Sequence, residues 1–470
     1  GRLNNKWFAP FDPYEVNFNY TEANSWQYSF YVPQDVSGHI QLMGGKAQYV
    51  QMLDDLFTAK SKTSGRDQSD ITGLIGQYAQ GNEPSHHMAY LYNFVNKPHK
   101  TQSMIRKILE EQYANAPDGI SGNEDCGQMS AWYIFSALGF YPVTPGSNEY
   151  IIGSPVVKSA TINLENGKIF QINAPNNKKG KPYIKNVLLN GMEHQQSYIT
   201  HGDIINGGSL TYEMSRRKSD WGTSDENIPE TKIEDYIITT PPFIEKGDAA
   251  FENETTIVLK SLQPEATIYY SLGEAFMKYE SPITITDDRE ISTYAVFNGN
   301  KSATLKTRFR KTNPDIKISL ATTYSNQYSA GGDRALVDGI LGSEDFRTGT
   351  WQGYVGADVV ATVDISKVQQ IDKLAVNFLS DQNYWIFYPK EVFFFGSKDG
   401  ENFDLIDSFK IEMSEINNGE IKTIENDNIK TPYRYIRVVA KKIGDVPEWH
   451  KGFEDGGMGW IFVDEIQIKH

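Results

Sequence analysis

Three short acidic segments contain residue types that could carry out acid–base chemistry. The first runs from Thr21 to Asp35, the second is QGNEPSHH at residues 80–87, and the third is GNEDCGQ at residues 122–128. The second and third segments come directly before apolar stretches that are typical of helices. Capping explains any one of them, because Asn, Ser and Asp side chains accept hydrogen bonds from the free N–H groups at helix starts. Capping explains less well why carboxylates, amides, two histidines and a tryptophan recur at successive helix starts.

A carboxylate pair at the ends of several helices is what hydrolysis of a glycosidic bond requires. One acid protonates the leaving oxygen, and one base activates water. A zinc site is disfavoured, because the adjacent His86 and His87 point to different faces of a helix. Nucleophilic catalysis is disfavoured as well, because the sequence has no G-x-S-x-G motif. The loops are rich in oxygen ligands, which suit a hard cation such as calcium. These ligands are Gln80, Asn82, Glu83, Asn123, Glu124 and Asp125.

Composition narrows the classes of partner. The chain has 470 residues with 45 Lys and Arg against 60 Asp and Glu, a net charge of −15. An acidic chain repels phosphate backbones and anionic lipid, so we expect no nucleic-acid partner and no membrane-surface binding. No run of about 18 apolar residues is present, so we expect no membrane span. The length predicts about three or four domains.

The pattern of apolar residues changes from helical to β along the chain. Residues 1–145 are predicted to be helical, with an apolar stripe over 38–60 and about five or six helices in all. Residues 128–138 are apolar almost all round, which predicts a buried helix. From 146 to 225, alternating patterns around the Asn-Gly pairs at 166–167 and 190–191 predict hairpins in an antiparallel sheet or sandwich. After a polar linker, residues 240–311 and 315–470 are predicted to form two further β-domains.

The first half of the chain resembles glycoside hydrolase family 92, the calcium-dependent exo-α-mannosidases. The resemblance covers about residues 5–222 and lies in EANSWQYSFYVPQD, GQYAQGNEPSHHMAYLY and SGNEDCGQMSAWYIFSALGFYPVTPGSNEYIIGSP. It implies the C-terminal part of an (α/α)6 barrel over 1–145, closed by a β-sandwich or sheet over 146–225. It also implies inversion at the anomeric carbon, with Glu22 as general acid and Asp125 as general base. The family often has an acidic residue where this chain has Asn123.

The same resemblance assigns further residues by position. Asn82 and Glu83 match the region that holds calcium. Six residues match positions in or near the substrate-binding site: Trp26, Gln27, Asp35, Glu124, His86 and His87. The family's N-terminal sandwich and about half of its barrel lie outside these residues. We therefore expect this missing N-terminal part to be a partner of the site, and the present residues alone to be weakly active or inactive.

The two C-terminal domains carry resemblances of their own. Residues 240–311 resemble the small β-sandwich that follows the catalytic domain of chitobiases. Residues 315–470 resemble a discoidin-like module, the coagulation factor 5/8 type C group that includes carbohydrate-binding module family 32. The motifs are ALVDGILGS, TWQGYVGADVVATVDI and GWIFVDEIQI, and Asp338 and Glu465 match positions that hold a structural calcium in relatives. Five aromatic residues are candidates for exposure, of which we expect about three to be packed: Trp351, Tyr384, Trp385, Trp449 and Trp460. Trp449, Trp385 and Trp351 are the predicted sugar-stacking residues, Trp449 foremost.

The sequence therefore predicts a multidomain protein, a partial (α/α)6 barrel followed by β-sandwich domains of which the last is a discoidin-like jelly roll. The first functional hypothesis is a fragment of a secreted or periplasmic exo-α-mannosidase. It would release terminal α-1,2-mannosides from mannose-containing glycans, such as N-glycans, with calcium and an appended sugar-binding module. The alternative is a non-catalytic carbohydrate-binding protein. The three intact carboxylates Glu22, Glu83 and Asp125 favour the enzyme.

Overall fold

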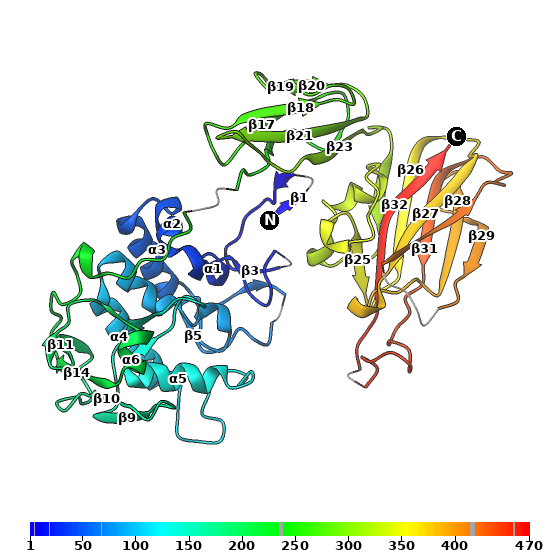
Figure 1. The fold of residues 1–470 in the computed structure, drawn as a ribbon. Helices are drawn as coiled ribbons and strands as arrows, with labels where there is room; N and C mark the ends of the chain where they lie inside the picture. The colour runs from blue at the N-terminus through cyan, green and yellow to red at the C-terminus, as the bar shows by residue number, and fades with distance from the viewer. Residues whose placement is uncertain (4, 18, 67, 235–237, 414–418, 455) are drawn as a thin grey trace. The chain divides into compact units, whose positions relative to one another are not determined.

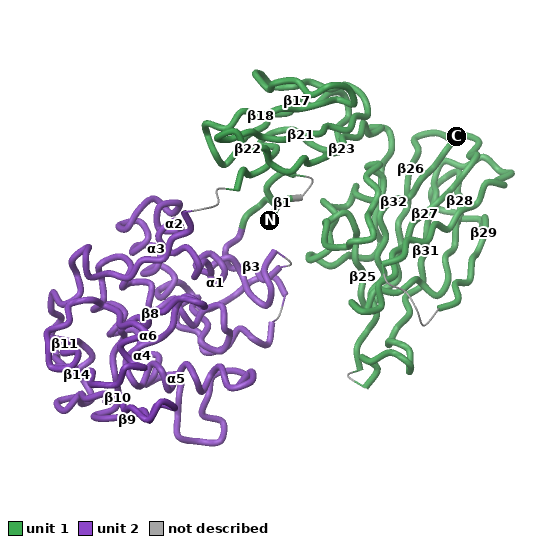
Figure 2. Tube along the Cα trace, viewed as in Figure 1, with its two compact units in different colours: residues 1–11, 238–470 green, residues 12–237 purple. Residues whose placement is uncertain are grey.

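The computed structural model describes residues 1–470 except 4, 18, 67, 235–237, 414–418 and 455. The chain divides into two compact units (Figure 2). Unit 2 is Asp12–Ile237, and unit 1 joins Gly1–Phe11 to Ile238–His470. In the described part of the chain, no helix is long and apolar enough to cross a membrane.

Short helices dominate the first part of unit 2 (Figure 1). The α-helices are α1 (Ser25–Tyr28), α2 (Val36–Leu42), α3 (Lys46–Thr58), α4 (Pro98–Glu111) and α5 (Gln128–Leu138). Three 3-10 helices lie between them: η1 (Pro33–Asp35), η2 (Glu83–Ser85) and η3 (Met88–Val95). The stripe on α3 is buried through Tyr49, Leu53 and Leu56, which pack against Tyr90 and Phe94 of η3 in one apolar core. The predicted helices are confirmed from α1 onward, but the short strands β4 (Ser64–Gly65), β5 (Leu74–Ile75) and β6 (Tyr78–Ala79) interrupt them. The place of these helices in a barrel stays a prediction.

Helix α5 is less buried than its sequence indicates. Met129 and Trp132 face the core, whereas Tyr133 and Ile134 are 39% and 57% exposed. The prediction of a helix buried on every side is therefore wrong for this face. Apolar residues on all sides show that a helix can be buried, but its neighbours decide which sides are covered.

A mixed sheet follows the helices in unit 2. Its strands run in the order β12-β11-β14-β10-β9. Their bounds are β9 (Ser159–Asn163), β10 (Ile169–Asn173), β11 (Tyr183–Leu189), β12 (Met192–Glu193) and β14 (Gly208–Ser215). Both predicted hairpins are present, at 166–167 and 190–191. The expected antiparallel sheet is wrong in one place, because β10 and β14 pair in parallel. A smaller sheet joins β7 (Phe140–Tyr141), β8 (Glu149–Ile152) and β13 (Tyr198–Thr200).

The first eleven residues belong to unit 1, which corrects the prediction that they form part of the helical domain. β1 (Arg2–Leu3) and β2 (Lys6–Trp7) extend a sheet of the small β-domain, where Lys6 pairs with Ile244 of β15 (Phe243–Lys246). That sheet continues through β17 (Thr255–Lys260) and β20 (Ile283–Ile285). The facing sheet contains β16 (Ala250–Phe251), β18 (Thr267–Ser271), β19 (Met277–Lys278), β21 (Arg289–Phe297), β22 (Asn300–Lys301) and β23 (Leu305–Lys311). Ile257 from the first sheet and Ile291 and Phe309 from the second share one apolar core.

The C-terminal domain is a sandwich of two sheets. One sheet has the order β24-β26-β31-β28-β29 and the other β25-β32-β27-β30. The first contains β24 (Lys317–Leu320), β26 (Val359–Gln369), β28 (Glu391–Ser397), β29 (Asp404–Lys410) and β31 (Tyr433–Ala440). The second contains β25 (Gln352–Val355), β27 (Lys373–Ser380), β30 (Glu420–Asn426) and β32 (Trp460–Lys469). Inward-facing residues alternate along β26, and these side chains pack against β27 and β32.

Candidate active site

The first acidic segment enters α1 through a hydrogen-bonded turn. The side chain of Asn24 accepts the N–H of Gln27, and Gln27 Oε1 accepts the N–H of Asn24 at 3.0 Å, which makes a capping box. Asn24 Nδ2 also donates to Gln77 Oε1 at 2.8 Å. Glu22, two residues before the cap, is exposed and has a left-handed backbone with φ 55°. The amide contacts fix the turn and leave the Glu22 side chain at the surface.

The second segment is tied to the first and lies against the third. Asn82 Nδ2 donates to the carbonyl oxygen of Glu22 at 3.1 Å. Glu83 follows at the start of η2. A Cβ added to Gly122 would lie 2.6 Å from Cα of Gly81, so glycine at both positions lets the two loops touch backbone to backbone. This close approach brings the loop of Glu83 to the loop of Asp125.

The third segment turns sharply into α5. Asp125, Cys126 and Gly127 are successively left-handed, with φ of 44°, 56° and 93°. The Glu124 carboxylate accepts the N–H of Ser130 at 3.2 Å and its hydroxyl at 3.0 Å, so it holds the start of the helix. Asp125 is exposed beside it. The turn separates two neighbouring acids: Glu124 binds the helix, and Asp125 points to a neighbouring loop.

The carboxyl groups of the three segments influence one another. The carboxyl groups of Glu83 and Asp125 interact closely enough for Asp125 to affect the pKa of Glu83. Burial raises the pKa of Glu83, and the nearby carboxyl groups of Asp125 and Glu22 raise it further. The structure thus brings together three of the predicted site residues, Glu22, Glu83 and Asp125, from three different loops.

The two histidines hold the loops in place. His86 Nε2 donates to the carbonyl of Gln80 at 2.9 Å, and its Nδ1 accepts from Gln128 at 3.0 Å. His87 Nε2 donates to the carbonyl of Phe30 at 2.7 Å. Both rings are buried, and burial lowers the pKa of each to about 4, so both are neutral at pH 7. Direct contact of either ring with a sugar stays a prediction.

Three other predicted substrate-binding residues, Gln27, Asp35 and Trp26, differ in the hydrogen bonds that their side chains make within the fold. The Gln27 side chain also donates to the carbonyl of Gln77 at 3.0 Å, so both its amide oxygen and its amide nitrogen bond within the fold. Asp35 accepts the N–H of Gly38 at 2.8 Å and caps α2. Trp26 differs, because its buried Nε1 has no hydrogen-bond partner. The Trp26 Nε1–H is thus a donor that no contact among the described residues uses.

The oxygen donors of Asn82 and Glu83 bear on whether these loops can hold a cation. In the described part of the chain, no group of three or more His, Cys, Asp or Glu is close enough to hold a metal ion. Asn82 makes no capping hydrogen bond with its side chain, although it is the residue before η2. Its amide oxygen and the Glu83 carboxylate are donors of the kind that calcium prefers. A divalent cation would also offset the repulsion between Glu83 and Asp125. Asn82 and Glu83 therefore fit a calcium ion in donor chemistry.

The C-terminal domain has a separate buried acidic group. Asp338, Asp464 and Glu465 lie together, and burial is the first cause that raises their pKa values, to about 7, about 6 and about 9. Asp464 accepts the N–H of Gly342 at 2.7 Å, and Glu465 accepts that of Gly339 at 3.1 Å. Asp464 was not singled out in the sequence, although it adjoins Glu465 and interrupts an apolar strand.

The aromatic candidates of this domain are mostly packed, as expected. Trp351 is 1% exposed, so its prediction as a sugar-stacking residue is wrong. Trp385 is partly buried, and a Cβ on Gly452 or Gly457 would overlap its ring, which shows how closely that loop covers it. Trp449 and Tyr384 are 41% and 52% exposed. Trp449 thus stays a prediction, and Tyr384 becomes the most exposed of the set.

Comparison with known proteins finds that two segments of the chain are similar to known families. Residues 1–216 match the family model of the glycosyl hydrolase family 92 catalytic domain. The first half of the chain is thus similar to this catalytic domain. Residues 320–456 match the F5/8 type C domain. The family 92 match includes residues 1–11, which the structure pairs with β15 in unit 1.

Individual proteins and solved structures are also similar to parts of this chain. An uncharacterized secreted glycosidase of Arthroderma benhamiae is 29% identical over 211 residues, which are 44% of this chain and 25% of the relative. A family 92 α-mannosidase of Bacteroides thetaiotaomicron, solved with mannoimidazole, is 43% identical over 48% of this chain and 31% of its own, with a TM-score of 0.45. A CBM32 module from a Clostridium perfringens family 31 glycoside hydrolase is 20% identical over 34% of this chain and 96% of its own, with a TM-score of 0.22. The match thus spans about a quarter of the length of the fungal relative and about a third of the length of the α-mannosidase.

Proposed function

We propose that this chain supplies the catalytic carboxylates of an exo-acting α-mannosidase that hydrolyses terminal α-1,2-linked mannosides with inversion. The observation that carries the proposal is the convergence of Glu22, Glu83 and Asp125 from three loops. The family 92 match and the mannosidase relative support the choice of mannose. Because the relatives are much longer, we further propose that the N-terminal part they contain completes the site.

Glu22 and Asp125 have different roles in the reaction. Glu22 donates its proton to the leaving oxygen as the glycosidic C–O bond breaks. Asp125 takes a proton from the water molecule whose oxygen bonds to the anomeric carbon from the opposite face, so the configuration inverts. Neither group forms a bond to the sugar. Trp26 offers its unpartnered Nε1–H as a donor to a sugar oxygen.

The remaining residues of the site bind and orient. Asn82 and Glu83 would hold calcium, and the chemistry that the ion supplies when bound is a positive charge for sugar hydroxyl oxygens. Asn82 also holds the Glu22 peptide, so the position of the acid depends on this residue. The contact between Gly81 and Gly122 keeps the loop of Asp125 near the loop of Asn82 and Glu83.

Release of mannose from α-1,2-mannobiose tests the proposal. The chain is assayed with calcium and with EDTA, and again with the N-terminal part of the longer relatives restored. Glu22→Gln should lower the rate at least about 100-fold, because the leaving oxygen loses its proton donor. Glu111→Gln, on the exposed side of α4, is the control and should keep full activity. Full activity of Glu22→Gln would show that the acid is assigned wrongly, and hydrolysis unchanged by EDTA would exclude the calcium role.

A second candidate function is sugar binding without hydrolysis. It is favoured by the exposed Tyr384 and Trp449 on the C-terminal domain. Binding of mannosides with no release of mannose, even with the N-terminal part restored, would establish it. We also propose that the protein acts on glycans outside the cytoplasm, by analogy with the secreted fungal relative.

A further inference from the structure

Gln128, the first residue of α5, has no role in the proposed reaction, although it follows Asp125 by only three residues. Its Nε2 donates to His86 Nδ1 at 3.0 Å and to the hydroxyl of Tyr141 at 3.2 Å. Its backbone N–H donates to the carbonyl of Asp125 at 3.2 Å. Gln128 therefore holds the turn of Asp125 with its main chain and a buried histidine with its side chain.

The His86 ring connects Gln128 to the second acidic segment. Its Nε2 lies 2.9 Å from the carbonyl oxygen of Gln80, and a carbonyl can only accept, so Nε2 carries the hydrogen. Nδ1 is then the acceptor that the Gln128 amide requires. The His86 carbonyl accepts the Nε1–H of Trp132 at 2.8 Å, and Trp132 lies one turn after Gln128 on the same face of α5. Helix α5 thus contacts His86 at two points.

Gln80 is fixed by two tyrosines that lead back to α5. Tyr78 donates its hydroxyl to Gln80 Oε1, and Gln80 Nε2 donates to the hydroxyl of Tyr113 at 2.7 Å. The Tyr113 hydroxyl donates to the carbonyl of Met129 at 3.4 Å, and its ring is stacked on Trp132 with centroids 5.8 Å apart. Gln80 and Trp132 are fully buried. The contacts therefore form a closed circuit around the start of α5.

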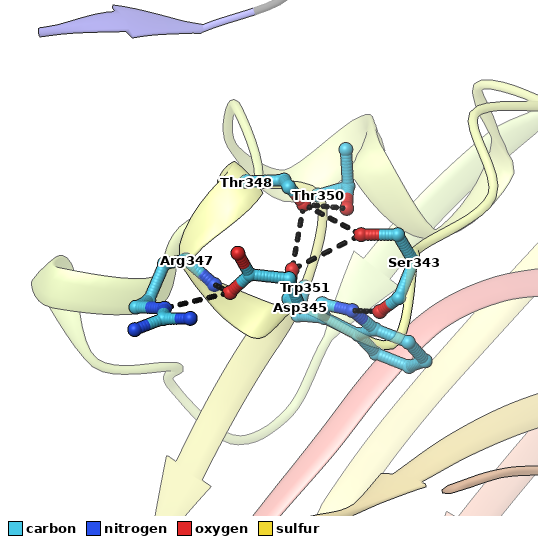
Figure 3. A network of polar contacts seen from close by, with 6 residues as sticks. All are labelled: Ser343, Asp345, Arg347, Thr348, Thr350 and Trp351. Carbon is cyan, nitrogen blue, oxygen red and sulfur yellow. Dashed lines mark hydrogen bonds and ion pairs between the residues drawn. The ribbon is translucent and has the colours of Figure 1, made fainter. Parts of the chain in front are cut away.

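Another polar network of the chain fixes only one loop. Figure 3 shows the network around Asp345, whose carbonyl accepts the hydroxyl groups of Ser343 and Thr348 at 3.1 and 2.9 Å. Trp351 Nε1 donates to the carbonyl of Ser343 at 2.8 Å, and its buried ring anchors the loop in the core. All four residues come from one short stretch of the chain. The circuit around His86 differs, because it joins segments that are far apart in the sequence.

The circuit complements the contact of Gly81 with Gly122. Gly122 precedes Asp125 by three residues, and Gln128 follows it by three. The second and third acidic segments are thus joined on both sides of Asp125, by a backbone contact before it and by the Gln128–His86 hydrogen bond after it. A displacement of about 1 Å in a catalytic group can lower a rate about 100-fold, so contacts that fix the base affect catalysis.

We propose that Gln128 is a positioning residue for Asp125: by bonding to the His86 ring, it holds the base at a fixed distance from the loop of Asn82 and Glu83. Gln128 acts through His86 and contacts no reacting atom. The inference rests on the proposed mannosidase function, and it assigns His86 to the support of the site rather than to the sugar. Loss of either partner should have the same effect, because the bridge needs both.

Mannose release from α-1,2-mannobiose tests this role, in calcium and with the N-terminal part of the longer relatives restored. Gln128→Met removes the N–H donor and should lower kcat at least about tenfold with less than about a threefold change in KM, because the base moves while the sugar-binding groups stay. His86→Gln keeps a donor for the Gln80 carbonyl, loses the acceptor for Gln128 and should behave alike. The double variant should fall at most about twofold further, whereas independent effects would multiply. Gln51→Met, at an exposed position of α3, is the matched control and should keep both constants.

Hydrogen exchange measured by mass spectrometry gives a readout that does not depend on activity. In Gln128→Met and His86→Gln, the amides of residues 127–131 should exchange at least about fivefold faster than in the wild type, because the start of α5 loses a contact. The amides of α3 should exchange at the wild-type rate in both variants. Unchanged near-UV circular dichroism shows that each variant is folded.

Each measurement has an outcome that would overturn the inference. Unchanged kcat in folded Gln128→Met would show that the base does not depend on this residue. A raised KM with unchanged kcat in His86→Gln would place the His86 ring against the sugar. Unchanged exchange at 127–131 would show that the bridge does not fix α5, whether or not mannose is released. Faster exchange in the variants of a protein that releases no mannose would instead contradict the mannosidase proposal and leave the bridge a structural contact only.

Discussion

Glu22, Asp125 and Cys126 share a backbone conformation that L-residues rarely adopt. Their φ angles are 55°, 44° and 56°, and each such residue costs about 1–3 kcal/mol. The surrounding contacts have to offset this cost: the Asn24 capping box follows Glu22, and the Glu124 contact to Ser130 follows Asp125. The two proposed catalytic carboxylates therefore lie at strained turns whose neighbours are hydrogen-bonded, which is common where a side chain has to be aimed.

The buried acids of the C-terminal domain lead to a pH-dependent prediction at this same scale. The pKa of Glu465 is raised in the folded protein, to about 9, so folding favours its protonated form. Its contribution to stability is thus present at low pH and lost as pH rises from about 4.5 toward about 9. Glu465→Gln keeps an acceptor for the N–H of Gly339 but cannot ionise. In EDTA at pH 8 it should melt at least about 3 °C above the wild type, and the difference should shrink at pH 5.

Calcium supplies the control for this prediction. Added calcium should raise the wild-type melting temperature at pH 8, because a cation bound by Asp338 and Glu465 would offset the negative charge that these two carboxyl groups gain at that pH. The gain should be smaller in Glu465→Gln. The exposed Glu448→Gln should follow the wild type at every pH. A Glu465→Gln variant that melts below the wild type at pH 8 would contradict the assigned sign.

At the scale of elements, the sequence predicts helices and turns that depend on neighbouring residues, but it does not predict which distant strands pair. The α3 stripe and the turns at 166–167 and 190–191 depend on residues close in sequence, and the structure confirms them. The parallel pairing of β10 with β14 joins Phe170 to Gly208, and no local pattern encodes such a contact. Exposure of one face of α5 has the same origin, because it depends on what packs there.

The candidate site divides in the same way. Motif position found Glu22, Glu83 and Asp125, whose interaction the structure supports. Position alone could not show that Glu124 binds Ser130 while its neighbour Asp125 does not, because the left-handed turn at 125–127 decides which acid faces the loop. It also could not show that Trp351 is a buried anchor, since an aromatic residue in a β-sandwich suits core and surface alike.

The contact of two loops through Gly81 and Gly122 gives a prediction about elements. In Gly122→Ala the added Cβ would lie 2.6 Å from Cα of Gly81, so the loops have to move apart. We expect a loss of about 1–3 kcal/mol in the free energy of unfolding and a lower rate of mannose release, because Glu83 and Asp125 separate. Denaturant unfolding and the mannobiose assay measure both. Gly202→Ala in α6 (His201–Ile205) is the control, because its Cβ would meet only an ordinary contact at 3.6 Å. Equal stability and activity of the two variants would show that the close contact has no role.

At the scale of the whole molecule, unit 1 is built from two segments that are far apart in the sequence. Residues 1–11 form strands with a domain that begins more than two hundred residues later, since Lys6 pairs with Ile244. Trp7 packs on Phe243 with ring centroids 5.5 Å apart, and Arg2 lies 4.5 Å over the Trp7 ring. Unit 2 is thus inserted, in chain order, between two parts of unit 1. Such an arrangement couples the folding of the small β-domain to a segment far from it in sequence.

Removal of residues 1–7 tests that coupling. The deletion exposes the edge of β15 and one face of Phe243, so the unfolding transition of unit 1 should fall by several degrees, about 2–4 °C for each kcal/mol lost. The transition of unit 2 should not move, because its core contains none of these residues. Differential scanning calorimetry resolves the two transitions, and Trp7→Ala should reproduce part of the shift through loss of the Phe243 contact alone. Lys260→Ala is the matched control, because it removes only an exposed ion pair with Glu245 on the neighbouring strand. It should lower the free energy of unfolding of unit 1 by less than about 1 kcal/mol. If the deletion instead lowers the transition of unit 2, residues 1–7 stabilise the helical domain, and the pairing with β15 is not what fixes them.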